Sequence, residues 1–162
     1  MKLKKIQKNK AFVLLFAVVI SSIILAIALG VANISLKEIN FGTSARDAND
    51  AFFAADTGAE CALYYDRSDN NAFIENEGSG MVECLGNPIN LEGNFPFWSF
   101  VISGLGSTGQ SCAKVTVSKD NTSILTTTTI ISKGYNVGDK NCSSSNPNRV
   151  ERELEVTYSK YE

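Results

Sequence analysis

Residues 11–36 contain no charged side chain, and this run constrains the fold more than any other feature of the chain. Lys10 precedes the run and Lys37 follows it. About 20 consecutive apolar residues cross a bilayer as a helix, so the run is long enough to span a membrane. Five lysines and no acidic residue occur in residues 1–11, which places the N-terminus on the cytoplasmic side. We expect a basic leader at 1–11 and a transmembrane helix half at 12–36.

The helical pattern continues beyond the apolar run, and no proline occurs before Pro88. Apolar residues then recur at alternating spacings of four and three, which is typical of one face of an amphipathic helix. These residues are Phe41, Ala45, Ala48, Phe52, Ala55 and Ala59. We predict one helix from Phe12 to Tyr65, about 80 Å long at 1.5 Å per residue. Residues 37–65 form its amphipathic, extracytoplasmic half, whose upper part packs on a sheet.

A cleaved secretory signal is an alternative for the N-terminus. Ala26-Ile27-Ala28 matches the small-residue pattern of a signal cleavage site. The apolar run is longer than the roughly 7–15 residues of a signal's apolar core, and no helix breaker precedes the site. We therefore favour a retained membrane helix.

The composition beyond the helix predicts a connecting segment and then a sheet. Residues 66–96 are rich in asparagine, glycine and acidic residues, and we expect a connection there with at most a short helix or strand. Alternating or β-branched patterns at 98–103, 112–118, 124–132 and 150–158 predict four strands. The side chains expected to face the core are Trp98, Phe100, Ile102, Ala113, Val115, Val117, Val150, Leu154, Val156 and Tyr158. The predicted fold is α+β, with the long N-terminal helix packed on a four-stranded antiparallel sheet formed by residues 97–162.

All four cysteines follow the apolar run: Cys61, Cys84, Cys112 and Cys142. An even number on the outer side of a membrane indicates two disulfides in an oxidising space. Four cysteines allow three pairings. We favour Cys61–Cys84 and Cys112–Cys142, because each bridge would join neighbouring elements. Four free thiols in a small core are the alternative.

The charge distribution argues against several functions. The chain beyond the leader carries all 17 acidic residues and ten of the 15 lysines and arginines, so we expect no direct binding of nucleic acid. Histidine is absent. No nucleophile–base pair, metal cluster or carboxylate dyad stands out, so we expect neither an enzyme nor a cofactor, metal or small-molecule substrate.

Two local patterns have simpler explanations than ligand binding. Gly104–Gly109 matches G-x-G-x-x-G, but a strand pattern follows where a dinucleotide site needs a helix, so we expect a hairpin loop. The acidic and amide residues Asp66, Asp69, Asn70, Glu75 and Glu77 do not match the calcium-loop spacing. We expect them to be solvated loop residues.

The N-terminal pattern resembles that of type IV pilins and pseudopilins. Precursors in this family carry a basic leader that ends in glycine, followed by phenylalanine and an apolar helix. In the stretch Lys10-Ala-Phe-Val-Leu-Leu-Phe16, Ala11 stands in the place of that glycine, and Phe12 would be the first mature residue. The fifth mature residue of the family is usually glutamate, and Phe16 stands there. The stretch from Asp50 to Glu60 resembles the A-F-x-A-A-E-x-A pattern of PilX-type minor pilins.

The resemblance implies a structural role. A prepilin peptidase would cleave between Ala11 and Phe12, and the partners would be other pilin subunits and an assembly platform. The chain would be a minor subunit of a type IV filament, or of a related secretion, adhesion or DNA-uptake machine. The chain would cross the cytoplasmic membrane once, with its N-terminus on the cytoplasmic side and its body outside, and it could pass into an extracellular filament.

Small side chains in the apolar run permit close helix contacts in lipid. They are Ser21, Ser22, Ala26, Ala28 and Gly30. Phe41 and Ala45 are expected to stay free for neighbouring helices. Two alternatives remain open: a single-span anchored binding domain that never polymerises, and, with less support, a membrane-tethered enzyme. The mature N-terminus distinguishes a pilin from a simple anchor.

Overall fold

A computed structural model describes residues 7–68, 71–74 and 80–161; for residues 7–11 and residue 36 it describes the backbone alone. One helix and seven strands make up this part of the chain. Their bounds are α1 Gln7–Arg67, β1 Met81–Cys84, β2 Asn87–Asn90, β3 Glu92–Asn94, β4 Phe97–Leu105, β5 Ser111–Asp120, β6 Thr126–Tyr135 and β7 Glu151–Lys160. The class is α+β, as the sequence predicts.

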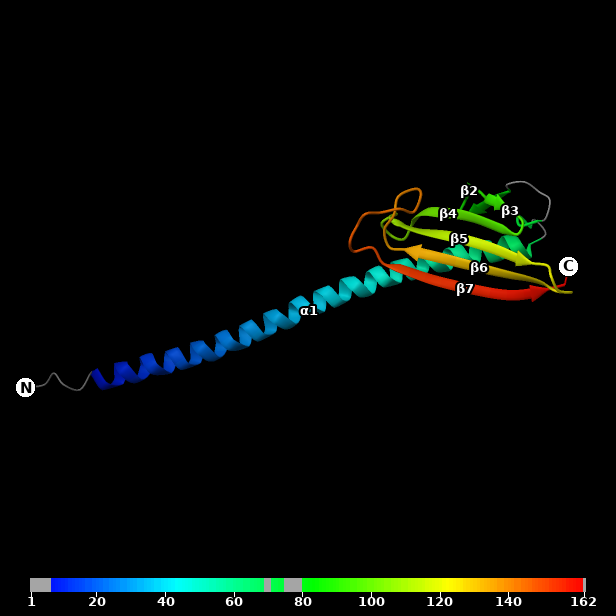
Figure 1. Ribbon diagram of the computed structural model, residues 1–162. Helices are drawn as coiled ribbons and strands as arrows, with labels where there is room; N and C mark the ends of the chain where they lie inside the picture. The colour runs from blue at the N-terminus through cyan, green and yellow to red at the C-terminus, as the bar shows by residue number, and fades with distance from the viewer. Residues whose placement is uncertain (1–6, 69–70, 75–79, 162) are drawn as a thin grey trace, which may run out of the picture. The chain divides into compact units, whose positions relative to one another are not determined.

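The chain divides between Ser44 and Ala45 into two compact units, and α1 contributes to both. The first unit is helical over its described residues (Figure 1). The helix continues beyond Lys37, and it ends two residues after the predicted Tyr65. No proline interrupts this stretch, and the weak helix formers within it, such as Gly30, Gly42 and Gly58, do not break the helix.

The second unit contains two sheets rather than the one predicted. Strands β3-β4-β5-β6-β7 form a five-stranded antiparallel sheet in that order, and β1 pairs with β2 in a separate two-stranded sheet. The four predicted strands correspond to β4, β5, β6 and β7. Their register is regular: β5 and β6 pair from Cys112↔Tyr135 to Asp120↔Thr127. The predicted glycine-rich hairpin is confirmed, because Gly106 and Gly109 lie in the turn between β4 and β5.

The expectation of at most one short helix or strand within 66–96 is wrong, because β1, β2 and β3 all lie within this segment. These strands are only three or four residues long. Strands β2 (NPIN) and β3 (EGN) are mainly polar, and in β1 (MVEC) Val82 and Cys84 are buried. The β1–β2 hairpin turns at Leu85 and Gly86, both with positive φ (55° and 75°). This combination matches a two-residue hairpin turn, in which the first position usually holds Asn, Asp or Gly. Leucine at that position hides the hairpin from sequence patterns.

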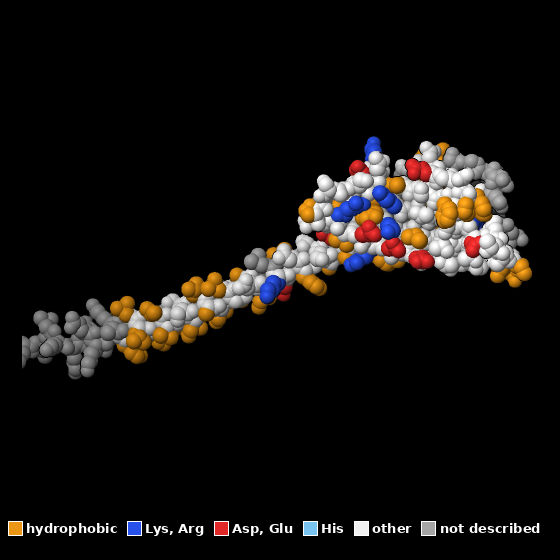
Figure 2. All heavy atoms as spheres, in the orientation of Figure 1, with side chains coloured by type: hydrophobic (Ala, Val, Ile, Leu, Met, Phe, Trp, Pro, Cys, Tyr) orange, Lys and Arg blue, Asp and Glu red, His pale blue; other side chains and the backbone are white. Residues whose placement is uncertain are grey.

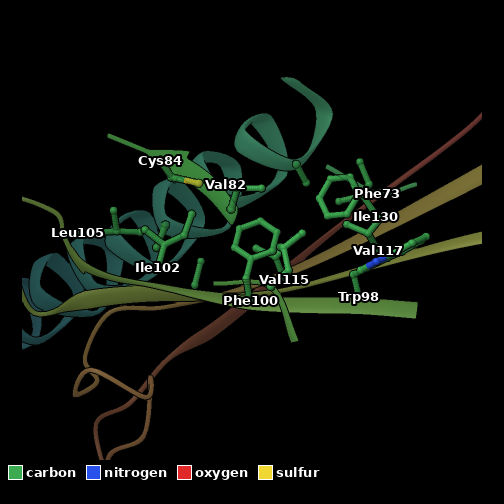
Figure 3. Close-up of a cluster of buried hydrophobic side chains, with 14 residues drawn as sticks. Phe73, Val82, Cys84, Trp98, Phe100, Ile102, Leu105, Val115, Val117 and Ile130 are labelled. Carbon is green, nitrogen blue, oxygen red and sulfur yellow. The ribbon is translucent and has the colours of Figure 1, made fainter. Parts of the chain in front are cut away.

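One face of the five-stranded sheet packs on the helical part of the second unit (Figure 1). The sheet supplies the large side chains of the core, and all inward positions predicted on β4 and β5 are buried. Figure 3 shows Phe100, Ile102 and Val115 between the sheet and the helix, with Phe73 beside Ile130. The half-buried Leu154, Val156 and Tyr158 of β7 also face inward, as predicted.

The helix supplies small side chains to this contact. Its small buried residues are Ala51, Ala54, Ala55, Gly58, Ala59 and Ala62. A Cβ on Gly134 of β6 would lie 2.1 Å from the carbonyl oxygen of Ala51, so the backbones of helix and strand approach each other closely. The predicted stripe is therefore only partly right. Ala55 and Ala59 are buried, but Phe52 is 42 % exposed, because the face that meets the sheet has room for alanine and not for phenylalanine.

Candidate membrane-spanning and assembly surfaces

The first unit presents apolar side chains over the whole of its apolar run. By length and composition, α1 contains a segment able to span a membrane. Phe12 is 70 % exposed and Phe16 is 58 % exposed, and the large aliphatic side chains between Val13 and Ile34 are also exposed. Figure 2 shows these hydrophobic side chains along the helix. A continuous apolar surface of this kind marks contact with lipid or with other proteins.

The predicted cleavage position lies within helical backbone. Ala11 and Phe12 are both part of α1. Lys2, Lys4 and Lys5 of the leader lie outside the described residues. Phe16 stacks on Phe12, with ring centroids 6.5 Å apart and an angle of 11° between the planes. This position therefore offers an aromatic ring one helical turn from Phe12.

The predicted small residues fall on two sides of the helix. Successive residues of an α-helix are about 100° apart, so Ser22, Ala26 and Gly30, at spacings of four, share one face. Ser21 and Ala28, seven residues apart, share a roughly opposite face. A side chain at Gly30 would meet no atom within 4 Å. The apolar segment therefore has small residues available for close contacts on both sides.

The two serines do not add unsatisfied polar groups to this surface. The Ser21 hydroxyl donates to the carbonyl of Val18 at 3.0 Å, and that of Ser22 donates to Val19 at 2.8 Å. Bonds of this type satisfy a hydroxyl within its own helix. Both residues are thus compatible with an apolar environment.

Aromatic side chains also lie on outward-facing parts of the helix. Phe41 of the first unit is 79 % exposed, and Ala45, the first residue of the second unit, is exposed. Within the second unit, Phe53 is 62 % exposed and Tyr64 is 67 % exposed. Phe53 and Tyr64 are 11 residues apart, which places them on one face, opposite the buried alanines. Contact of Phe41 and Ala45 with a neighbouring subunit stays a prediction.

A buried ionic cluster joins the end of α1 to three strands. The Asp66 carboxylate lies 2.6 Å from Nζ of Lys119 on β5 and 3.3 Å from Nζ of Lys160 on β7. It also accepts hydrogen bonds from the hydroxyls of Tyr158 on β7 and Thr128 on β6. Both ammonium groups lie near the C-terminal end of the helix, where positive charge is favourable.

The electrostatics of this cluster favour an ionised Asp66. Burial by itself raises the pKa of the carboxyl group. Hydrogen bonds from Lys119 and Tyr158, together with the charges of Lys119 and Lys160, outweigh that effect and hold the pKa below its usual value. Burial and the bond to Asp66 raise the pKa of the Tyr158 hydroxyl, which therefore remains a donor. The cluster therefore fastens the end of α1 to β5, β6 and β7, and we call it the ionic lock.

The expectation that Asp66 is a solvated loop residue is wrong, since it is 1 % exposed and belongs to the helix. The sequence does contain a signal for its partners. Lys119 continues the inward alternation of Ala113, Val115 and Val117, and Lys160 continues that of Val156 and Tyr158. A lysine at an inward strand position predicts a buried acidic partner. Asp69, Asn70, Glu75 and Glu77 lie outside the described residues.

Both favoured disulfides are present. Cys61 of α1 is bonded to Cys84 of β1, and Cys112 of β5 is bonded to Cys142 in the loop at 136–150. The first bridge attaches the β1–β2 hairpin to the helix, where the Tyr65 hydroxyl also accepts a hydrogen bond from the backbone N–H of Glu83 at 2.9 Å. The second bridge attaches the loop to the sheet.

The long loop at 136–150 has further internal supports. Arg149 donates to the carbonyl of Cys142 at 2.8 Å, and its guanidinium lies 3.7 Å from the centre of the Tyr135 ring. The Asp139 carboxylate accepts backbone hydrogen bonds from Asn141 and Ser143. The bond from Ser143, followed by that from Asn141, lowers the pKa of Asp139. The loop is therefore a fixed part of the surface of the second unit.

Neither a metal-binding cluster among the described residues nor a match to a known protein is found. Over the ranges 7–68, 71–74 and 80–161, no group of three or more cysteine or carboxylate side chains could hold a metal ion. No protein-family model, curated protein or solved structure matches the chain. The fold and the surfaces above therefore carry the functional argument by themselves.

Proposed function

We propose that this chain is a structural subunit, a minor pilin-like protein of a type IV filament or a related secretion, adhesion or DNA-uptake machine. The observation that carries the proposal is the apolar part of α1, with exposed large side chains and small residues on two sides. Lipid would cover this surface before assembly, and neighbouring helices would cover it in a filament. A helix that needs contacts on several sides suits a filament core better than a contact with one partner.

Small residues on both sides support this packing. In lipid, helices gain little from burying apolar surface against each other, so close backbone approach through small residues stabilises their association. One stripe, Ser22, Ala26 and Gly30, would receive one neighbour, and Ser21 and Ala28 would receive another. In the second unit, the exposed Phe53 and Tyr64 would add aromatic contacts near such a core.

Extraction into a filament requires removal of the leader. Five lysines lie in residues 1–11. Each would cost about 2.5–3.5 kcal/mol at the centre of a bilayer on insertion scales. Cleavage after Ala11 leaves a single α-amino group at Phe12. An N-terminus inside the cell and a body outside follow from the same lysines.

Phe16 supports a minor role. In the family this position usually holds a glutamate that meets the N-terminal amine of a neighbour, and Phe16 offers no carboxylate. The amine at Phe12 would then find its partner in a different subunit that carries the glutamate. We infer that this chain joins filaments built mainly of another pilin.

The alternative is an anchored binding domain that keeps its leader and does not polymerise. A shearing experiment separates the two. Filaments sheared from cells should contain this protein as a low-copy component beside a more abundant pilin. The Ala11→Trp protein should be missing from the sheared fraction and should stay in the membrane. The Ala11→Ser protein, with a small replacement, should still be found in the sheared fraction.

Two outcomes would contradict the proposal. Absence of the wild-type protein from the sheared fraction, when the major pilin is present, would favour the anchored domain. Filaments made of this protein alone would contradict the minor role and leave the structural role standing.

A further inference from the structure

The outer face of the five-stranded sheet contains a hollow of about 650 Å³ at the end where β4 begins. This volume lies in the range of roughly 300–1,000 Å³ that is usual for small-ligand sites. The lining residues are Phe95, Pro96, Phe97, Ser118, Lys119, Asp120, Asn121, Thr122, Thr127 and Thr129. Figure 2 shows hydrophobic side chains over this end of the sheet, among neutral polar ones.

An exposed aromatic ring forms the apolar part of the hollow. Phe97 is 62 % exposed, while its neighbour Trp98 faces the core and is 1 % exposed. Phe97 is opposite Ser118 on β5, and Ser118 is opposite Thr129 on β6, so a row of hydroxyl groups begins beside the ring. Neighbouring strands are about 4.8 Å apart, so successive hydroxyl groups of this row are separated by about that distance.

The polar groups of the hollow keep capacity to bind a ligand. The hydroxyl of Thr127 shares one hydrogen bond with Ser159, and that of Thr129 shares one with Thr157. A hydroxyl has one donor and two acceptor positions, so each retains at least one. The side-chain amide of Asn121 makes no hydrogen bond to any described residue, and it offers donors and an acceptor together.

The charges of the hollow exclude anionic ligands. Lys119 lines it, but its ammonium group is buried and is held by Asp66 and by the carbonyl of Phe73. The exposed charge among the lining residues is the Asp120 carboxylate, which accepts a hydrogen bond from the backbone N–H of Thr122 at 2.9 Å. A phosphate, sulfate or carboxylate ligand would meet this negative charge, and no lining residue offers it an unpaired cation.

The strand pairing also excludes a peptide that binds by adding a strand. Residues Phe97 to Ser99 of β4 pair with β3 on one side and with β5 on the other. No free backbone edge exists at this point, so a ligand must be recognised by side chains. Only the face of the sheet is open to it.

We propose that this hollow binds a neutral oligosaccharide. The Phe97 ring would stack on the apolar C–H face of a sugar ring, and Asp120, Asn121 and the threonine hydroxyls would bond to its hydroxyl groups. A sugar combines these two kinds of surface, as the hollow does. Binding of this kind is independent of whether the chain polymerises.

The test measures binding of the full chain in lipid nanodiscs to maltotriose, cellotriose, chitotriose and lactose, with 3′-sialyllactose as the anionic member. Saturation-transfer NMR and titration detect weak binding. At least one neutral sugar should bind, and Phe97→Ala should weaken its binding at least tenfold. Phe97→Trp should restore it, because the flat ring is retained. Asp120→Asn should weaken binding while leaving the fold intact, since this side chain is exposed.

Phe53→Ala is the matched control, because Phe53 has the same 62 % exposure and lies on the helix. It should leave sugar binding unchanged. Three results would overturn the proposal: no neutral sugar binds, binding is insensitive to Phe97→Ala, or the sialylated sugar binds better than lactose. Binding of an unmodified extended peptide in a Phe97-dependent way would also overturn it.

Discussion

Asp66 shows how a single residue connects the parts of the second unit. It is the last buried residue of α1, and its carboxylate meets side chains from β5, β6 and β7. A buried ion pair adds little stability relative to a well-packed apolar contact, but removing one partner leaves the other charges buried and uncompensated. Lys119, which is 7 % exposed, would be left in that state.

We therefore expect Asp66→Asn to destabilise the second unit by about 3–5 kcal/mol at neutral pH. Urea unfolding followed by the fluorescence of Trp98, the one tryptophan of the chain, measures this directly. Asp56→Asn is the control on the same helix, and its effect should stay within about 0.5 kcal/mol. Equal effects of the two substitutions would show that the cluster is not a lock.

The same residue predicts a pH dependence. The pKa of Asp66 is lower in the folded state than its ordinary value of 3.8. A carboxyl group of this kind contributes its full stability above the unfolded pKa, and the contribution is lost as the pH falls through the folded pKa. Below about pH 4, unfolding of the wild type should therefore depend more steeply on pH than that of Asp66→Asn.

At the scale of elements, the sequence predicts regular patterns well and irregular ones poorly. The helix follows from the apolar run, the later apolar periodicity and the absence of proline, and β4 to β7 follow from alternating or β-branched patterns. Strands β1 to β3 are too short to show a clear alternation, and β2 and β3 are mainly polar. The turn between β1 and β2 contains Leu85 where asparagine is usual. The periodicity also places Phe52 rather than Ala51 on the face that meets the sheet. The buried position is decided by the close approach of Gly134 to the helix, and a local sequence pattern does not contain this contact.

The candidate surfaces also divide into features that the sequence predicts and features that it does not. The apolar segment and both disulfides follow from composition and spacing. The Asp66 cluster was missed, although Lys119 and Lys160 stand at inward positions of their strands. Its geometry depends on four elements that lie far apart in the sequence, so their meeting can be known only from the fold.

Each disulfide fastens a different element, so removal of one bridge should loosen a different part of the second unit than removal of the other. In the chain-entropy model, loops of this size make each bridge worth about 3–4 kcal/mol. Replacing Cys61 and Cys84 with serine should raise hydrogen exchange mainly in the β1–β2 hairpin. Replacing Cys112 and Cys142 should raise it mainly in the loop at 136–150. Free-thiol labelling of all four cysteines in protein from its native envelope would contradict the presence of both bridges.

At the scale of the whole molecule, the two units have different requirements. The second unit buries a core between helix and sheet, and it is closed by two disulfides and an ionic lock. The first unit buries none of its apolar run and needs lipid or other helices around it. A subunit that passes from membrane to filament meets both requirements, provided that its basic leader is removed.

The most direct test of this account is the mass of the N-terminal peptide of the protein recovered from membranes and from sheared filaments. We expect a mature chain that begins at Phe12 in both fractions, with residues 1–11 absent. Ala11→Trp should leave the leader in place, and Ala11→Ser should not. An intact basic leader on the wild-type protein, in cells whose other pilins are cleaved, would contradict the account and identify the chain as a simple membrane-anchored domain.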